Sequence, residues 1–154
     1  MTLQQVIKAF EVIASNQPAV NMIVRNDVYR LNAKPDAKYG AFAWLQQTHS
    51  GRIDSSLVRY AFTFFYVDRL TSDKSNEVEI QSTGIEVLTN IIRQLDVLGV
   101  YCPDGYSFNS FNERFVDDCA GVSCEVVFEV PVGAACPESF ADFNDDFNED
   151  FMIY

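Results

Sequence analysis

Apolar residues near the N-terminus recur every three or four positions, which is the spacing of one helix face. The residues that follow this spacing are Leu3, Val6, Ile7, Phe10 and Ile13. The pattern predicts a helix from about Thr2, as N-cap, to about Ala14. Pro18 ends it, because the residue before a proline is pushed out of the helical region.

A different period marks the middle of the chain. In "LVRYAFTFFYVDRL", residues 57–70, side chains alternate between two faces, as in a strand. One face would carry Tyr60, Phe62, Phe64 and Tyr66, and the other Arg59, Ala61, Thr63, Phe65 and Val67. Both faces are mostly apolar, so we expect a central strand that is covered on both sides.

The stretch "YVDRLTSDKSNEVEIQ", residues 66–81, marks the corner between this strand and a second helix. Ser75 or Asn76 can cap the helix, and Asn76 with Glu79 resembles a capping box. The expected helical stripe is Val78, Gln81, Ile85, Leu88, Ile92 and Leu95, ending at Leu98-Gly99. We interpret Asp68 and Arg69 as the end of the strand, where they form a salt bridge locally or contact a neighbouring subunit.

Shorter segments predict further strands. Two fall within residues 20–33, around the turn pair Asn26-Asp27, and another covers 41–48. Segments 33–40 and 49–56 are expected to be loops, and 107–116 an edge strand. In "GVSCEVVFEVPV", residues 121–132, alternation predicts the last strand of the sheet, antiparallel and half-buried. Its inward side chains would be Val122, Cys124, Val126, Phe128 and Val130.

This order of elements predicts an α+β fold, in which a mostly antiparallel sheet is flanked by two main helices. We expect one domain over residues 1–137, followed by an acidic, Phe-rich C-terminal tail over 138–154. The tail is either a short interaction segment or a solvated end. Its aromatic residues are spaced by three or four: Phe140, Phe143, Phe147 and Phe151.

The net charge of −11 over 154 residues argues against nucleic-acid binding, which relies on Lys and Arg facing phosphates. It also disfavours anionic membranes, and no segment is long and apolar enough to span one. The first residues lack the pattern of a signal peptide. We therefore expect folding in a cytoplasm, with the cysteines reduced.

Candidate catalytic chemistry is sparse. Cys119 and Cys124 stand at the loose end of zinc-ligand spacing, and Cys102 and Cys136 have no near partner. His49, the single histidine, lies in a polar loop. No nucleotide-binding, zincin or nucleophile-elbow motif occurs. We expect no enzyme, no metal and no cofactor; structural zinc, and a hydrolase using His49 with Cys119 or Cys124, are the weaker alternatives.

The chain resembles a group of small virion proteins of tailed bacteriophages that infect Bacteroides-type hosts, including the crAss-like phages. Three phrases carry the resemblance: "DVYRLNAKPDAKYGAFAWLQQTHS", "FTFFYVDRLTSDKSNEVEIQSTGIEVLTNIIRQL" and "FVDDCAGVSCEVVFEVP". The order of elements is also similar to that of tail-terminator and neck-ring proteins. The resemblance covers roughly residues 1–132 and leaves the acidic tail outside it.

The resemblance implies a structural subunit of the head-to-tail connector, located in the virion after assembly in the host cytoplasm. Six or twelve copies would form a ring around the DNA channel, next to portal and tail proteins, without binding the DNA specifically. Contacts with these partners are expected at Asp68 and Arg69 and at Phe140, Phe143, Phe147 and Phe151. The alternative is a monomeric module that recruits a partner through its acidic tail.

Overall fold

A computed structural model describes residues 1–27, 39–52, 54–112 and 118–131, and the backbone of 152–153. The two helices are α1 (Leu3–Ser15) and α2 (Glu77–Val97). The strands are β1 (Met22–Arg25), β2 (Ala41–Gln46), β3 (Ser50–Gly51), β4 (Leu57–Arg69), β5 (Ser107–Asn112), β6 (Cys119–Pro131) and β7 (Met152–Ile153).

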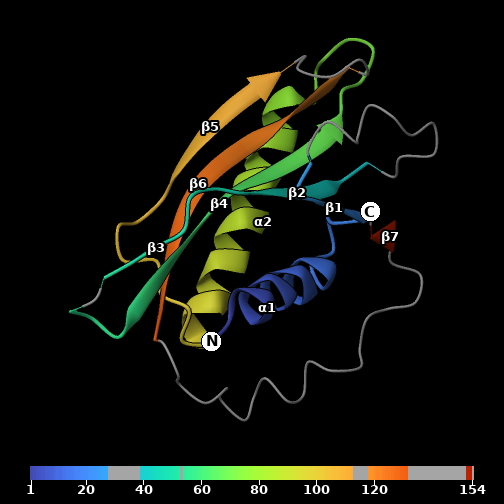
Figure 1. Ribbon diagram of the computed structural model, residues 1–154. Coiled ribbons are helices and arrows are strands. Elements are labelled where there is room, and N and C mark those ends of the chain that lie inside the picture. The colour runs from blue at the N-terminus through green and yellow to red at the C-terminus, as the bar shows by residue number, and fades with distance from the viewer. Residues whose placement is uncertain (28–38, 53, 113–117, 132–151, 154) are drawn as a thin grey trace.

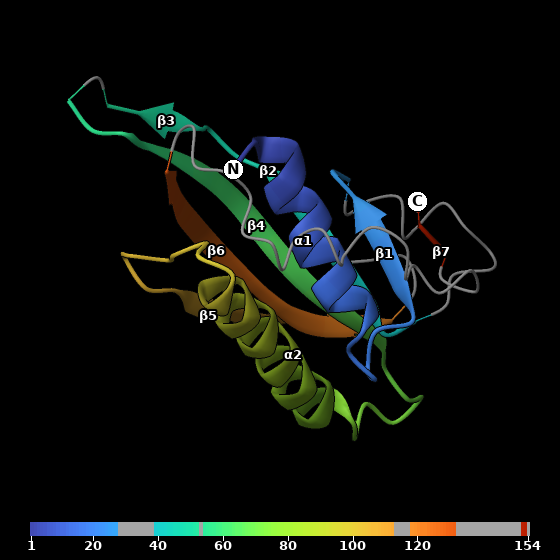
Figure 2. The same ribbon diagram turned by 90° about the horizontal axis from the view of Figure 1, so that it is seen from below.

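All seven strands belong to one sheet, in the order β5-β6-β4-β2-β1-β7, with β3 paired to β4 (Figure 1). β1 runs parallel to β2 and to β7, and every other pairing is antiparallel. Figure 2 shows α1 and α2 on the same face of the sheet. The predicted α+β fold, with a mostly antiparallel sheet and two main helices, is confirmed.

Helix α1 begins as its sequence predicts. The Thr2 hydroxyl accepts a hydrogen bond from the Gln5 backbone N–H at 3.2 Å. The Gln5 side chain in turn accepts one from the Thr2 N–H at 2.8 Å, which completes a capping box. The helix ends at Ser15, one residue beyond the predicted end.

Helix α2 begins differently from the prediction. Asn76 occupies the N-cap position, but its side chain makes no capping hydrogen bond. Instead its amide oxygen accepts from the Thr71 N–H at 2.9 Å, and its amide nitrogen donates to the Arg69 carbonyl at 3.2 Å. The predicted capping box with Glu79 is therefore wrong, because the side chain of Asn76 holds the preceding turn together.

The buried face of α2 also differs from the predicted stripe. Val78 is 75% exposed and Ile85 is 39% exposed. The residues that pack inward are Ile80, Gly84, Val87, Leu88, Ile91, Ile92 and Leu95. A helix turns by about 100° per residue, so Val78 and Ile85 project well away from this inward direction. Gly84 lies where a Cβ atom would come within 2.7 Å of Val122, which lets α2 approach the sheet closely.

The main core lies between the helices and the sheet. Phe62 and Phe64 of β4 share it with Leu88, Ile92 and Leu95 of α2, as predicted. The predicted inward residues of β6, from Val122 to Val130 in steps of two, are all buried there. Strand β6 pairs antiparallel with both β4 and β5, as predicted, but it is not the last strand of the sheet, because β7 follows it in the chain.

A second apolar cluster lies on the opposite face of the sheet. It is made by Met22, Val24, Ala41, Ala43, Phe65, Val67, Phe111 and Cys119. From Phe62 to Val67, β4 is buried on both faces, which confirms its predicted central position.

The turns and short strands of the structure match the predicted ones only in part. Asn26 has a φ of 51°, which fits the predicted turn after β1. The second strand expected within residues 20–33, and most of the loop 33–40, lie outside the described residues. The expected loop 49–56 contains the two-residue strand β3, and the expected edge strand 107–116 is described as β5 up to Asn112.

Candidate functional site

Asp68 and Arg69 lie at the surface corner where β4 ends, as the sequence indicates. The Asp68 carboxylate accepts a hydrogen bond from the Arg69 backbone N–H at 2.7 Å. The Arg69 guanidinium lies 4.4 Å from the centroid of the Tyr39 ring, a cation–π distance. The next residue, Leu70, donates its N–H to the Asp118 carbonyl at 2.8 Å, which ties the corner to the chain before β6.

The aromatic residues of the tail lie outside the described residues. Of residues 138–154 the structure describes the backbone of β7, which pairs Met152 with Met22 and Ile153 with Ile23. A strand at this position was not predicted, and it returns the end of the chain to its own sheet.

His49 holds the turn before β3 against β4. Its Nδ1 accepts a hydrogen bond from the Ala61 backbone N–H at 3.2 Å, and its Nε2 lies 3.2 Å from the Gln46 side-chain oxygen. A backbone N–H can only donate, so Nδ1 carries no proton and Nε2 donates to Gln46. The ring also packs edge-on against Tyr60, 5.5 Å between centroids. These contacts assign His49 a structural role.

The cysteines behave as small apolar side chains where they are described. Cys119 and Cys124 are fully buried, and Cys102 is half-buried. Burial raises the pKa of the Cys124 thiol to about 12, so the reactive thiolate is disfavoured. Among the described residues, no group of three His, Cys, Asp or Glu side chains could hold a metal ion. Cys136 lies outside them.

Alkaline pH is expected to weaken the fold through two buried groups. Burial raises the pKa of Cys124 from 9.0 to about 12 and that of Tyr66 from 10.0 to about 12. A raised folded-state pKa stabilises the fold below the unfolded pKa, and this stabilisation is lost as the pH rises through the folded value. Between pH 8 and 11 the urea midpoint, followed by circular dichroism, should therefore fall.

The control for this prediction is Cys124→Ala, which removes one of the two groups. Its urea midpoint at pH 8 should be lower than that of the wild type because of lost packing. Between pH 8 and 11, the urea midpoint of Cys124→Ala should then fall by less than that of the wild type. An equal decrease in both proteins would show that Cys124 does not contribute to the pH dependence.

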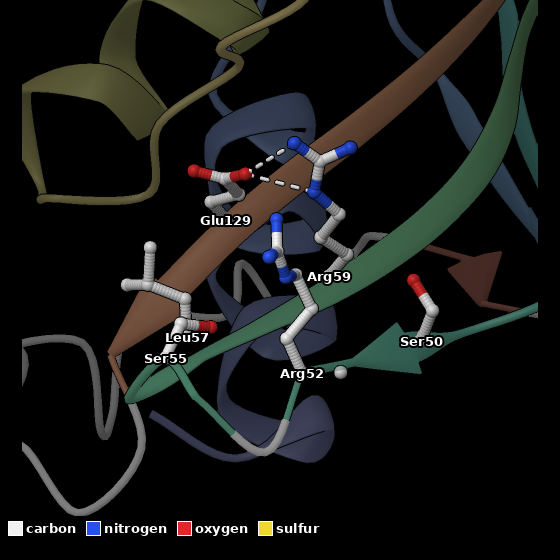
Figure 3. A pocket seen from close by; sticks show the side chains of 7 residues that line it. Ser50, Arg52, Ser55, Leu57, Arg59 and Glu129 are labelled. Atoms are coloured by element: carbon white, nitrogen blue, oxygen red, sulfur yellow. Dashed lines mark hydrogen bonds and ion pairs between the residues drawn. The ribbon is translucent and has the colours of Figure 1, made fainter.

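A surface pocket of about 390 Å³ lies where β3 meets the start of β4 (Figure 3). The Arg59 Nε donates to Glu129, its cross-strand neighbour, at 2.8 Å, and its Nη1 lies 3.3 Å from Asp104. Arg52 donates two hydrogen bonds to Asp54, at 3.1 and 2.8 Å. Each guanidinium thus already faces a carboxylate, and the pocket is not a strong anion site.

A second cleft of about 390 Å³ lies beside α1, and we call it the α1 cleft. Its lining residues are Gln4, Ile7, Lys8, Glu11, Arg25 and Trp44. Glu11 is only 2% exposed. Both of its oxygens accept hydrogen bonds from Arg25 at 2.7 Å, and one also accepts from the Trp44 indole at 3.0 Å. The hydrogen bond to Glu11 is the main cause of the raised pKa of Arg25.

The sequence pattern did not predict this network, although it contained one sign of it. Glu11 stands one residue after Phe10 and four after Ile7, on the apolar face of the predicted helix. A carboxylate at such a position is buried only when it is paired. The partners themselves come from β1 and β2, 14 and 33 residues further along the chain.

The outer side of β5 is an open sheet edge. Within the described residues, β5 pairs with β6 alone. Its sequence, "SFNSFN", has no charge and no proline, and Ser107, Asn109, Ser110 and Asn112 are exposed. Lys and Pro are the residues that usually protect an edge strand from pairing with another chain. This edge therefore offers unprotected backbone N–H and C=O groups for strand addition.

No protein-family model matches the chain, and no curated protein is significantly similar to it. Neither described helix is long and apolar enough to cross a membrane.

Proposed function

We propose that this protein is a repeated structural subunit, which forms a ring in the head-to-tail connector of a tailed bacteriophage. The main support for assembly into a ring is the open, uncharged edge of β5. The virion context comes from the resemblance over residues 1–132. In this ring, portal-side and tail-side components meet the subunits above and below.

A closed ring needs a contact in which one surface of a subunit binds a different surface of the next. The β5 edge supplies one such surface. On the opposite side of the sheet, the described part of β3 pairs with β4 alone, so its outer side is a second, different edge. Two unlike edges on one subunit are compatible with a ring of six or twelve copies.

The charge of the subunit fits a channel that DNA passes through. The chain carries a net charge of −11, which repels phosphates and opposes tight binding of the DNA. A wall of such subunits guides the duplex without retaining it. We propose no sequence-specific contact with the DNA.

A lysine on the β5 edge should prevent assembly. The substitution Ser110→Lys places an ammonium on the exposed edge, where a pairing strand would have to desolvate it. We expect the wild-type protein to form rings by native mass spectrometry and electron microscopy at micromolar concentration. The variant should shift to monomer, with the ring dissociation constant raised by roughly tenfold or more.

The matched control is Ser82→Lys, which adds the same charge at an exposed position of α2. It should assemble like the wild type. A wild-type protein that stays monomeric at every concentration, also with its portal partner present, would refute the ring and favour the monomeric module. Equal assembly of both lysine variants would exclude β5 as the contact.

A further inference from the structure

Strands β2 and β3 together form one long strand that is interrupted by a bulge. Both pair antiparallel with β4, β2 as far as Gln46 and β3 from Ser50 onward. Between these two points, three residues of one strand, 47–49, face only two residues of β4, 60–61. One extra residue on one strand makes a β-bulge, which interrupts the ladder of backbone hydrogen bonds.

The His49 side chain takes the place of a backbone carbonyl in this bulge. Gln47 donates its backbone N–H to the Ala61 carbonyl at 2.9 Å, which is half of the reciprocal pair found in a regular antiparallel ladder. The Ala61 N–H, which would complete the pair, donates instead to Nδ1 of His49 at 3.2 Å. Nε2 of the same ring lies 3.2 Å from the Gln46 side-chain oxygen, so both ring nitrogens are held.

This arrangement requires a neutral imidazole. Nδ1 accepts from Ala61 through its lone pair, and Nε2 carries the single ring proton toward Gln46. A second proton would occupy Nδ1 and point at the Ala61 N–H, so that two donors would face each other. Imidazole takes up this second proton in the range of about pH 5 to 8. A protonated His49 and the hydrogen bond to Ala61 therefore exclude each other.

Within the described residues, the groups around the ring do not compensate a positive charge. Tyr60 and Phe62 of β4 pack against it, at 5.5 and 5.7 Å between ring centroids. The Tyr60 hydroxyl donates to the carbonyl of Met1 at 3.5 Å, and Met1 carries the N-terminal ammonium, a further positive charge. The charged side chains beside β3 and on β4 are already in ion pairs: Arg52 with Asp54, and Arg59 with Glu129.

We propose that His49 is a pH-sensitive switch for β3, closed when Ala61 donates to the neutral ring and open when the ring is protonated. The closed form binds one proton fewer than the open form. Its stability is therefore present above the pH range in which imidazole titrates, and it is lost as the pH falls through that range.

Opening of the switch releases β3, because only Ser50 and Gly51 pair with β4 beyond the bulge. Two residue pairs are too few to hold a strand once the adjoining hydrogen bond is lost. Strand β3 is one of the two edges proposed for the ring. The switch itself is a property of the single subunit, so its test does not depend on the ring.

Hydrogen exchange of the Ala61 amide, measured by mass spectrometry with fragment ions that isolate single amides, tests this switch in the full-length protein. The protection factor compares the exchange rate with that of an unfolded chain at the same pH. For Ala61 it should fall by roughly tenfold between about pH 7.5 and pH 5, the effect of leaving one backbone donor without its acceptor. The amide of Phe64, in the middle of β4, should change far less, because it opens only with the whole sheet.

The matched control is His49→Asn, because the asparagine Oδ1 occupies the position of Nδ1 and accepts a hydrogen bond without titrating. It should keep Ala61 protected at both pH values, whereas His49→Ala, without an acceptor, should show low protection at both. A wild-type protection factor that stays constant would overturn the proposal. So would an equal fall in His49→Asn, since a group other than His49 would then control the bulge.

Discussion

Phe64→Ala is expected to lower the free energy of unfolding by about 3–5 kcal/mol, the typical cost of truncating a buried phenylalanine. Phe64 is completely buried on the helix-facing side of β4. Its ring meets Phe10 of α1 at 5.0 Å, Phe42 of β2 at 5.3 Å and Phe128 of β6 at 5.9 Å, measured between centroids. One side chain thus connects four elements, and the cavity left by alanine cannot close without moving several of them. A loss of this size is comparable to the whole stability of a marginal domain.

Denaturant unfolding followed by circular dichroism measures this loss, with Phe108→Ala as the matched control. Phe108 is half-buried on β5, and its ring contact is with Tyr106 at 5.6 Å. The free energy of unfolding of Phe108→Ala should fall by only about 1–2 kcal/mol, because less of the Phe108 ring than of the Phe64 ring leaves water on folding. Equal losses would show that the aromatic cluster around Phe64 is not the centre of the fold.

The long elements could be predicted because their patterns are long. Strand β4 alternates over 13 residues, and the apolar face of α1 recurs over a helix of 13 residues. A register shift of one residue would move every side chain of such a strand to the opposite face of the sheet. Burial of the apolar side chains therefore strongly determines the register of the strand. Strands β3 and β7 have two residues each, too few for any period. Their pairing depends on which part of the sheet the chain reaches, and the sequence pattern does not contain that information.

The start of α2 shows a different limit. Asn76 followed by Glu79 has the composition of a capping box, but Asn76 bonds to Thr71 and Arg69 instead. An asparagine side chain can hydrogen-bond any nearby backbone group, and the turn before the helix competes with the helix for it. Here the Thr71 hydroxyl also donates a hydrogen bond to the Asp73 carboxylate, at 2.7 Å. The position of this turn in the folded protein therefore decides which backbone groups Asn76 binds.

The candidate site residues also differ in how far the sequence could predict them. The Asp68-Arg69 corner is a local feature, and the sequence located it correctly at the end of β4. The network of Glu11, Arg25 and Trp44 depends on three elements, α1, β1 and β2, which meet only in the folded sheet. Periodicity could place Glu11 on an apolar face, but it could not identify the partners. A buried carboxylate is therefore a sign that a partner exists, and the topology supplies it.

Breaking this network should have the second largest effect on stability. Arg25→Ala leaves the carboxylate of Glu11, 2% exposed, with the Trp44 indole as the one remaining donor of the network. We expect a loss of about 2–4 kcal/mol, below the usual cost of removing one partner of a fully buried pair, because Arg25 itself is half-exposed. The double variant Arg25→Met with Glu11→Leu removes both charges and keeps most of the apolar volume, so it should be more stable than Arg25→Ala alone. Urea unfolding, followed by circular dichroism, gives both free energies. If the double variant is the less stable of the two, the ion pair itself stabilises the fold, and the burial of an unpaired carboxylate is not the source of the loss.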